Sequence, residues 1–106
     1  MSAVSEQLGA SILFENDQVR VWDDRVAPSE TQHIHVHKRP YLAVIVSGEK
    51  AETIGEDGSV ERTYDDITAG ETHWFGPEQL PFVHALRNTG SIEISVVIVE
   101  LLNAPA

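Results

Sequence analysis

The sequence predicts an all-β fold, a sandwich or barrel of short strands. Three observations support this: β-branched and aromatic residues fall in short runs, turn residues separate the runs, and no segment keeps a helical period for more than a few turns. Nine such runs in so short a chain favour two sheets or a closed barrel. The expected strands span about residues 11–15, 19–26, 31–37, 41–47, 50–55, 60–64, 72–75, 82–88 and 91–102.

Turn residues lie at the boundaries between these runs. Residues 15–18 read ENDQ, 27–30 APSE, 56–59 EDGS, 68–71 TAGE and 88–91 NTGS. Asn, Asp, Pro and Gly suit the backbone angles of tight turns. The EDGS segment between two alternating runs is typical of a β-hairpin.

The last expected strand has one apolar face and one polar face near its start. Its apolar face carries Ile92, Ile94, Val96, Ile98 and Leu102. This strand should therefore be an inner wall of the fold. Glu100 falls on the same face, either at a solvated open end of the barrel or as a buried carboxyl that would be an acid/base candidate, and we expect the solvated position.

The length and composition predict one compact domain. The chain has 106 residues, 42% of them hydrophobic and 23% charged, which is typical of a globular protein. We expect residues 1–106 to form a single domain with a barrel core from about 12 to 102. The first residues lack the charged start and long apolar stretch of a signal peptide, so a cytoplasmic location is expected.

The charge balance excludes some classes of partner. Seventeen acidic against seven basic residues give a formal net charge of -10, which repels phosphate backbones and anionic lipid headgroups. We therefore expect neither nucleic acid nor a membrane surface as a partner. The sequence has no cysteine, so any bound metal must sit on nitrogen and oxygen atoms.

Residues 33–37 read HIHVH within an expected strand. The two-residue period places His33, His35 and His37 on one face and Ile34 and Val36 on the other. Same-face neighbours on a strand lie about 7 Å apart, so a metal bonded at about 2.1 Å to each ring nitrogen fits between two of them. An HxH pair on a strand is therefore a two-point chelate.

Histidines on an exposed strand face are also common without any metal. His84, in the late segment PFVHALRN, favours a metal site over exposed histidines without metal, because a strand returning from elsewhere in the barrel can supply a third ligand. We predict one metal ion on His35, His37 and His84. His33 sits one pleat further out and is expected at the rim.

Two segments resemble the paired motifs of the cupin family. The segment HVHKRPYLAVIVSG, residues 35–48, is similar to the first cupin motif, with Tyr41 where the family usually has Glu. The segment from Gly70 to HALRN resembles the second, with His84 as the metal ligand and Asn88 four residues later. In this second segment GPEQLPF replaces the family's PxG. The resemblance covers the chain from about Phe14 to Leu102.

The resemblance implies a cupin-type double-stranded β-helix, also called a jelly-roll barrel, with a divalent metal ion. Fe or Mn is what it implies first, and Zn or Ni are the other candidates. The opening FENDQVRVW also looks like small single-domain cupins associated with the degradation of carboxylic acids and β-amino acids.

Tyr41 is the candidate for a catalytic contribution beside the metal. Its phenol has three possible uses: weak metal binding, a hydrogen bond to a bound ligand, or packing. We favour packing or a contact with a metal-binding residue, because Pro40 interrupts the strand just before it. His73 is expected to pack beside Trp74. Arg87 should point out of the barrel.

The function predicted from these residues is a metal-dependent enzyme acting on a small organic acid or carbonyl compound. Either oxygenase chemistry or Lewis-acid isomerase or hydrolase chemistry suits such a site. The alternative is a cupin that binds a small molecule without chemistry, and a third possibility is a structural protein with vestigial histidines. A homodimer is expected, because Ile34 and Val36 would otherwise leave an apolar outer face uncovered.

Overall fold

The computed structural model describes residues 4–103 and is built almost entirely of β-strands, which confirms the predicted all-β class. Within these residues no helix is long and apolar enough to cross a membrane. The strands are β1 (Ser11–Glu15), β2 (Val19–Val26), β3 (His35–His37), β4 (Tyr41–Ser47), β5 (Ala51–Ile54), β6 (Val60–Tyr64), β7 (Thr72–Phe75), β8 (Phe82–Asn88) and β9 (Ile94–Leu101), with one 3-10 turn, η1 (Pro77–Gln79).

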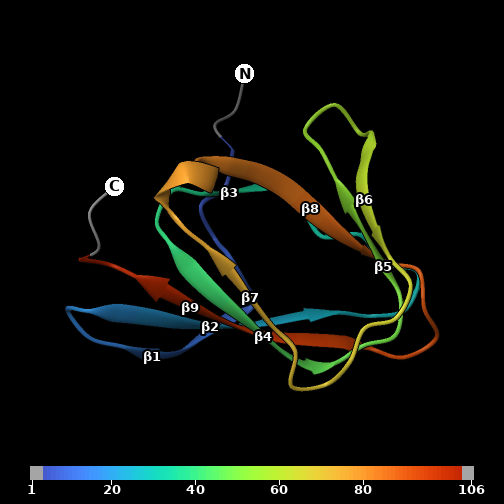
Figure 1. Ribbon diagram of the computed structural model, residues 1–106, viewed down its shortest axis with the longest axis horizontal. Helices are drawn as coiled ribbons and strands as arrows, with labels where there is room; N and C mark the ends of the chain where they lie inside the picture. Colours follow the sequence, from blue (N-terminus) through green and yellow to red (C-terminus); the bar gives the residue numbers. More distant parts are fainter. Residues whose placement is uncertain (1–3, 104–106) are drawn as a thin grey trace.

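The strands form two antiparallel sheets that face each other (Figure 1). The first has the order β1-β2-β9-β4-β7 and the second the order β3-β8-β5-β6. Consecutive segments repeatedly cross from one sheet to the other, so that β3 and β4 lie in different sheets, as do β7 and β8. The interior between the two sheets holds the core and the candidate site.

Two strands are shorter than the sequence predicts. The run expected at 31–37 is a strand only at β3, with an isolated bridge between Thr31 and Arg87 before it. The run expected at 91–102 begins only at Ile94, because Asn88 closes a turn before it. The Asn88 amide donates to the Ile92 carbonyl at 2.8 Å and accepts from the Gly90 N–H at 2.9 Å. The expected turn at Asn88 is thereby confirmed.

The inner faces of the sheets bury aliphatic and aromatic side chains. As the alternation in β9 predicts, Ile94, Val96 and Ile98 are buried and face the interior. Ile92, which was expected on the same face, lies before the strand and is 47% exposed. Burial of an aliphatic side chain of this size stabilises a fold by about 1.5–3 kcal/mol. The buried hydrophobic cluster consists of Leu8, Trp22, Val26, Tyr41, Ala43, Ala51, Ile94, Val96 and Ile98.

Glu100 is buried, whereas the sequence analysis expected it to be solvated. Its side chain lies on the inner face at the end of β9 with only 5% of the residue exposed. The Trp22 indole N–H donates to its carboxylate at 3.1 Å, and guanidinium nitrogens of Arg20 and Arg39 each lie 3.6 Å from it. The expectation was wrong because these partners come from β2 and from the residues before β4, whose positions the β9 pattern does not reveal.

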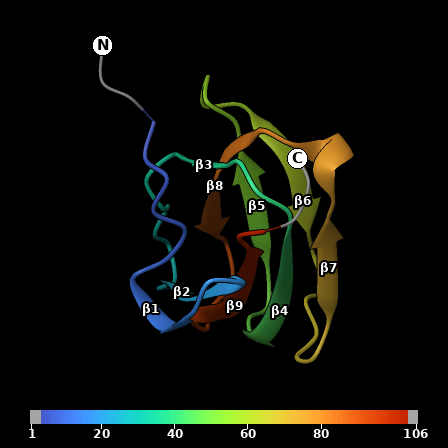
Figure 2. The same cartoon turned by 90° about the vertical axis from the view of Figure 1, so that its left-hand side faces the viewer.

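The N-terminal segment runs beside β3 and covers it (Figure 2). Ser5 forms a parallel bridge with His35, and the Val36 N–H donates to the Ser5 carbonyl at 2.8 Å. Val36 is therefore 8% exposed within a single chain, and Ile34 is half-buried. The expectation that both form an uncovered outer face is wrong for Val36, so these residues do not by themselves call for a partner.

Candidate metal centre

The three predicted histidines meet because β3 and β8 are paired. His35 lies directly opposite His84 in the antiparallel register, and His37 lies opposite Phe82. Directly opposed residues have Cβ atoms about 5 Å apart, so their side chains meet on the shared face. The HxH pair on β3 and the distant His84 are thereby brought to one point inside the barrel.

The three imidazoles form a nearly equilateral triangle. The ring centroids of His35, His37 and His84 lie 4.7, 4.9 and 5.0 Å apart in the three pairs. One nitrogen of each ring falls within 4.8 Å of the others, and among the described residues no carboxylate joins this group of potential ligands. The arrangement is a three-nitrogen site with no negative charge of its own.

The shortest separation in the triangle suits a metal ion. The Nε2 atoms of His37 and His84 lie 3.0 Å apart. For two nitrogens each bonded at about 2.1 Å to one ion, a separation of about 3.0 Å corresponds to an angle of about 90° at the ion, whereas a regular tetrahedral site needs about 3.4 Å. One divalent ion could therefore bind both of these nitrogens.

The three imidazoles are neutral at physiological pH. Burial lowers the pKa of His37 to about 2 and that of His84 to about 3, and it also lowers the pKa of His35. The Nδ1–H of His35 donates to the His33 carbonyl at 3.2 Å, which leaves the Nε2 lone pair free. No proton has to leave these rings before a metal binds near neutral pH.

The Nδ1 atoms of His37 and His84 are unusual for metal ligands. Both are buried, and neither has a hydrogen-bond partner within residues 4–103. Metal-binding histidines usually donate this second N–H to a carboxylate or carbonyl, which makes the ring a stronger donor. Two of the three rings lack this support, so they would donate less charge to a bound ion and leave it a stronger Lewis acid.

Aromatic stacking, rather than a hydrogen bond at Nδ1, holds the rings of His37 and His84 in place. A closed circuit of stacked side chains runs from His37 to Tyr41 (4.0 Å between ring centroids), Phe75 (4.6 Å), Phe82 (5.6 Å) and His84 (4.0 Å). The Nε2 contact between the two histidines completes it. This circuit fixes both imidazoles by packing, and its apolar side chains line one side of the candidate metal centre.

Tyr41 stands where the family motif has Glu, and it packs against a ligand. Its ring is stacked on His37 with an angle of 17° between the planes, and the residue is 2% exposed. Burial raises the pKa of its phenol above the ordinary value, so the group stays neutral. A neutral phenol is a poor metal ligand, and the observed contact agrees with the preference for packing.

A cavity of about 100 Å³ opens beside the triad between the two sheets. Most of its walls are apolar, which lowers the local dielectric and strengthens electrostatic interactions within it. The polar side chains that line it besides the three ligands come from other strands and turns, and they are Asp24, Gln32, Thr53, Tyr64, Glu71 and His73.

Asp24 is a cavity residue that the sequence analysis missed. It is buried, and burial raises its pKa to about 6, while a hydrogen bond from the Gln32 amide counteracts part of this shift. The Gln32 carbonyl oxygen accepts from the Leu86 N–H at 2.9 Å, which fixes the amide between β2 and β8. The signal was present in the alternation of β2, since Asp24 shares a face with the buried Trp22 and Val26.

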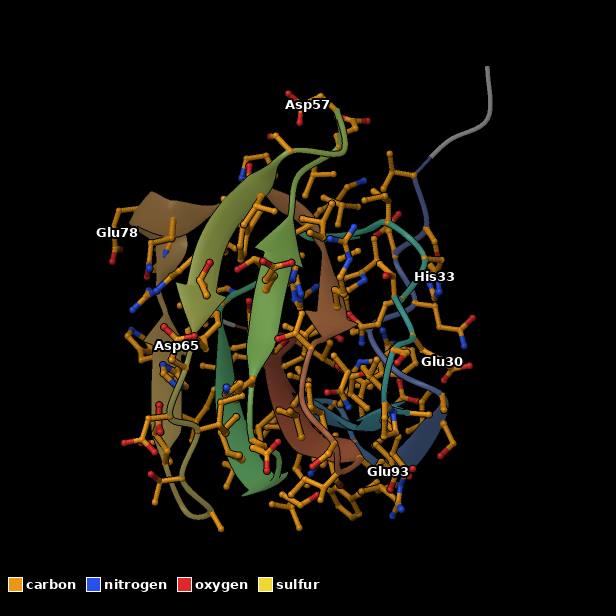
Figure 3. All side chains as sticks on the ribbon, turned by 90° about the vertical axis from the view of Figure 1, so that its right-hand side faces the viewer. Glu30, His33, Asp57, Asp65, Glu78 and Glu93 are labelled. Carbon is orange, nitrogen blue, oxygen red and sulfur yellow. The ribbon has the colours of Figure 1, made fainter. Side chains whose placement is uncertain are left out.

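The remaining sequence candidates fall on both sides of the barrel wall. His33 is exposed on the outer surface, as its rim position predicts, and its ring lies edge-on to that of His35 at 5.8 Å (Figure 3). His73 lines the cavity and its Nε2 lies 2.7 Å from Glu71, while Trp74 faces outward, so the expectation that His73 packs beside Trp74 is wrong. Arg87 points outward and pairs with Glu52 at 3.2 Å, as expected.

Comparisons with known proteins place this geometry in a known fold. No protein-family model and no curated protein matches the chain. Among solved structures, a cupin domain from Bordetella pertussis is 20% identical over 95% of this chain and 97% of its own, with a TM-score of 0.72.

Two further solved structures share this architecture. A conserved protein with a double-stranded β-helix domain from Klebsiella pneumoniae is 26% identical over 90% of this chain and 73% of its own, with a TM-score of 0.63. A DMSP lyase from Ruegeria pomeroyi is 14% identical over 86% of this chain and 42% of its own, with a TM-score of 0.58. The chain therefore has the cupin fold, a double-stranded β-helix, as its motifs predict.

Proposed function

We propose that this protein is a metal-dependent enzyme that acts on a small organic acid or carbonyl compound bound at His35, His37 and His84. The observation that supports it most is the convergence of three buried, neutral imidazoles on one point beside an apolar cavity. The Nε2 atoms of His37 and His84 have only each other as hydrogen-bond partners, 3.0 Å apart. A bound divalent ion would use the lone pairs that converge there.

The charge of this donor set determines what it attracts. Three neutral ligands leave the full 2+ charge of an ion uncompensated, whereas an added carboxylate would reduce it to 1+. When bound, the ion supplies Lewis acidity and open positions for an anionic or carbonyl oxygen. A carboxylate, enolate or similar small chelating group is therefore the favoured ligand, despite the protein's net charge of -10.

The residues around the triad position the imidazoles and exclude water, and they take no part in the reaction. Phe75 and Phe82 keep water away from one side of the triad, and Tyr41 holds the His37 ring by stacking. A cavity of about 100 Å³ admits only a compact molecule of a few non-hydrogen atoms. Both features favour a small substrate with an apolar body.

Fe or Mn is the favoured metal, and Zn or Ni are the alternatives. Imidazole ligands suit several divalent ions, so geometry and availability decide among them. The 3.0 Å separation between the Nε2 atoms of His37 and His84 would let both nitrogens bind one such ion. Such an ion keeps positions for substrate and for water, as either oxygenase or Lewis-acid chemistry requires.

The alternative function is a non-catalytic cupin that binds a small molecule. The same cavity and metal serve binding without reaction, and the fold alone does not separate the two because one fold hosts many functions. The DMSP lyase among the similar structures is an enzyme with this fold. Among residues 4–103 no fourth candidate ligand joins the three histidines, which favours chemistry, since a metal that only stabilises structure is usually enclosed by protein ligands.

One experiment tests this proposal and separates it from the alternative. Freshly purified protein is analysed for metal, and the apo and Fe(II)-loaded forms are then incubated with a panel of small carboxylic acids, β-diketones and thiols while substrate loss and dioxygen uptake are followed. Metal-dependent loss of at least one substrate supports the enzyme. If the apo protein equals the loaded protein on every compound converted, or if compounds bind without conversion, the binding module replaces it.

A cytoplasmic homodimer remains part of the proposal. The residues that would support a dimer are on β1, where Ile12, Leu13 and Phe14 are 46%, 57% and 55% exposed. β1 is the edge of its sheet, and an exposed apolar edge strand favours pairing with another chain.

A further inference from the structure

The cavity is lined by polar residues besides the three candidate metal ligands. Thr53, Glu71 and His73 all line the same cavity as the triad. They come from β5, from the residue before β7 and from β7, whereas the ligands come from β3 and β8. The fold therefore brings two separate polar groups of residues to one apolar chamber.

Thr53 is the unexplained residue in this region. It is 5% exposed, and within the described part of the chain its Oγ1 has no hydrogen-bond partner. It lies opposite Leu86 in the β5–β8 register, and both residues line the cavity. A buried hydroxyl without a partner is unfavourable, and valine would fill the same space without that penalty. A ligand in the cavity would give the hydroxyl its partner.

His73 is oriented as a hydrogen-bonding group beside the cavity. Its Nε2 lies 2.7 Å from a carboxylate oxygen of Glu71, so this nitrogen carries a proton and donates it to the carboxylate. The other ring nitrogen, Nδ1, is then free to bind a ligand, as in other carboxylate-oriented histidines. The Tyr64 ring packs edge-on against His73 at 6.2 Å, and the Arg62 guanidinium lies 4.9 Å above the Tyr64 ring.

Apart from its polar residues, the cavity wall is apolar. Ala43 lies opposite His73 in the β4–β7 register, and its small side chain leaves room at that point. The apolar residues that line the chamber are Ala43, Ile45, Ile67, Leu86, Ile94, Val96 and Ile98. This distribution suits a molecule with polar groups at two positions and a short hydrocarbon part between them.

We propose that Thr53 and the His73–Glu71 pair bind a second polar group of the substrate. The substrate is then a small bifunctional acid, with a carboxylate or carbonyl at the metal triad and a hydroxyl or carbonyl oxygen held by Thr53 and His73. This inference rests on the proposed function, because it takes the triad as the anchor of the first group.

The test compares acids that differ in one hydroxyl group. Protein loaded with Mn(II) is titrated with butanoate, 3-hydroxybutanoate and 4-hydroxybutanoate, using calorimetry for affinity and water-proton relaxation for contact with the ion. We expect one hydroxy acid to bind about 2–10-fold more tightly than butanoate, the range of a single added hydrogen bond. Thr53→Val and His73→Leu should each bring that ratio close to one while butanoate affinity and Mn content stay unchanged.

Matched control variants separate recognition from damage to the fold. Thr72→Val and His33→Leu make the same chemical changes at exposed positions and should leave the ratio unchanged. Thermal unfolding of each variant checks that it is folded. The inference is overturned if all three acids contact the ion with equal affinity, or if the preference survives in both cavity variants, and in either case the proposed function stands. If no acid contacts the ion, the proposed function fails and the inference fails with it.

Discussion

The Nε2 atoms of His37 and His84 lie 3.0 Å apart, although 47 positions separate the two residues in the sequence. The antiparallel pairing of β3 with β8 creates this contact, and the stacked rings of Tyr41 and Phe82 hold the two imidazoles from either side. The contact is therefore built into the fold, so a ligand that enters between these nitrogens meets a site that is already arranged.

Removing one of these imidazoles should abolish stoichiometric metal binding. His84→Leu keeps the apolar volume but removes one of three nitrogens, and two neutral imidazoles hold a divalent ion far more weakly than three. We expect metal content measured by mass spectrometry to fall from about one ion per chain to near zero. The same analysis of His33→Leu, which changes an exposed histidine, should give the wild-type value. Retention of metal by His84→Leu, or its loss from His33→Leu, would show that the ligand assignment is wrong.

Substitutions of Tyr41 should separate its ring from its hydroxyl. Tyr41→Phe keeps the stack on His37 and should leave metal affinity unchanged within about threefold. Tyr41→Glu places a carboxylate where the family motif has one and should tighten metal binding while lowering the Lewis acidity of the ion. Metal titration and turnover of any substrate found give both readouts. A large loss of turnover in Tyr41→Phe at full metal content would identify the hydroxyl as catalytic.

The metal-free protein should lose stability as the pH falls below about 6.5. The folded pKa values are about 2 for His37 and about 3 for His84, below the value near 6.5 of an unfolded chain. Between about pH 3 and 6.5 the unfolded chain therefore binds protons that the folded chain does not. The free energy of unfolding then falls by up to about 1.4 kcal/mol per pH unit for each histidine. Urea unfolding at several pH values measures this slope.

The control for this pH dependence is the His84→Leu variant, which lacks one of the titrating groups. Its unfolding free energy should fall less steeply than that of the wild type across the same pH range. Identical slopes in the two proteins would contradict the assignment of the acid loss to these histidines. Metal-loaded protein should be more stable at neutral pH and lose that gain on acidification, because protons compete with the ion for the ring nitrogens.

Asp24 should lower the stability of the protein as the pH rises, the opposite of the effect of the histidines. Its pKa in the folded protein is about 6, above the value near 3.9 in the unfolded chain. Protonated Asp24 therefore contributes to the free energy of unfolding below about pH 4, and this contribution is lost as the pH rises through 6. Asp24→Asn removes the buried charge and can still accept the hydrogen bond from Gln32. We expect this variant to be more stable than wild type by about 1–3 kcal/mol at pH 8 and equal to it near pH 4. A variant that is less stable at pH 8 would refute this account.

Oligomeric state provides a prediction independent of the metal. We expect a dimer in light scattering at micromolar concentration and a monomer when both Leu13 and Phe14 on the exposed β1 strand are changed to Ser. Because the two side chains are largely exposed in the single chain, the changes should leave its unfolding nearly unaffected. A wild-type mass equal to one chain would remove the dimer from the proposal.

The strand positions were predictable because each depends on local alternation. The face of β9 that carries Ile94, Val96 and Ile98 is buried as its sequence pattern requires. The triad was predictable for a similar reason, since parity fixes His35 and His37 on one face and the second motif marks His84 on another strand. Each of these signals is contained within a short stretch of sequence and needs no knowledge of the sheet order.

The environment of Glu100 was not predictable in this way. Its burial depends on Trp22, Arg20 and Arg39 reaching the same end of the barrel, and no pattern in β9 reveals which strands flank it. His73 was missed as a cavity residue for the same physical reason. Its position inside the chamber follows from the pairing of β7 with β4, a long-range contact that one strand's own sequence does not encode.

The position of Ser5 against His35 has a practical consequence for preparing the protein. An affinity tag fused at the N-terminus would place foreign residues a few positions from the strand that carries two of the three ligands. A polyhistidine tag there would also offer competing imidazoles, and its metal would be counted as metal of the barrel. A tag at the opposite end of the chain, removed before elemental analysis, avoids both errors and lets the measured stoichiometry report on the triad alone.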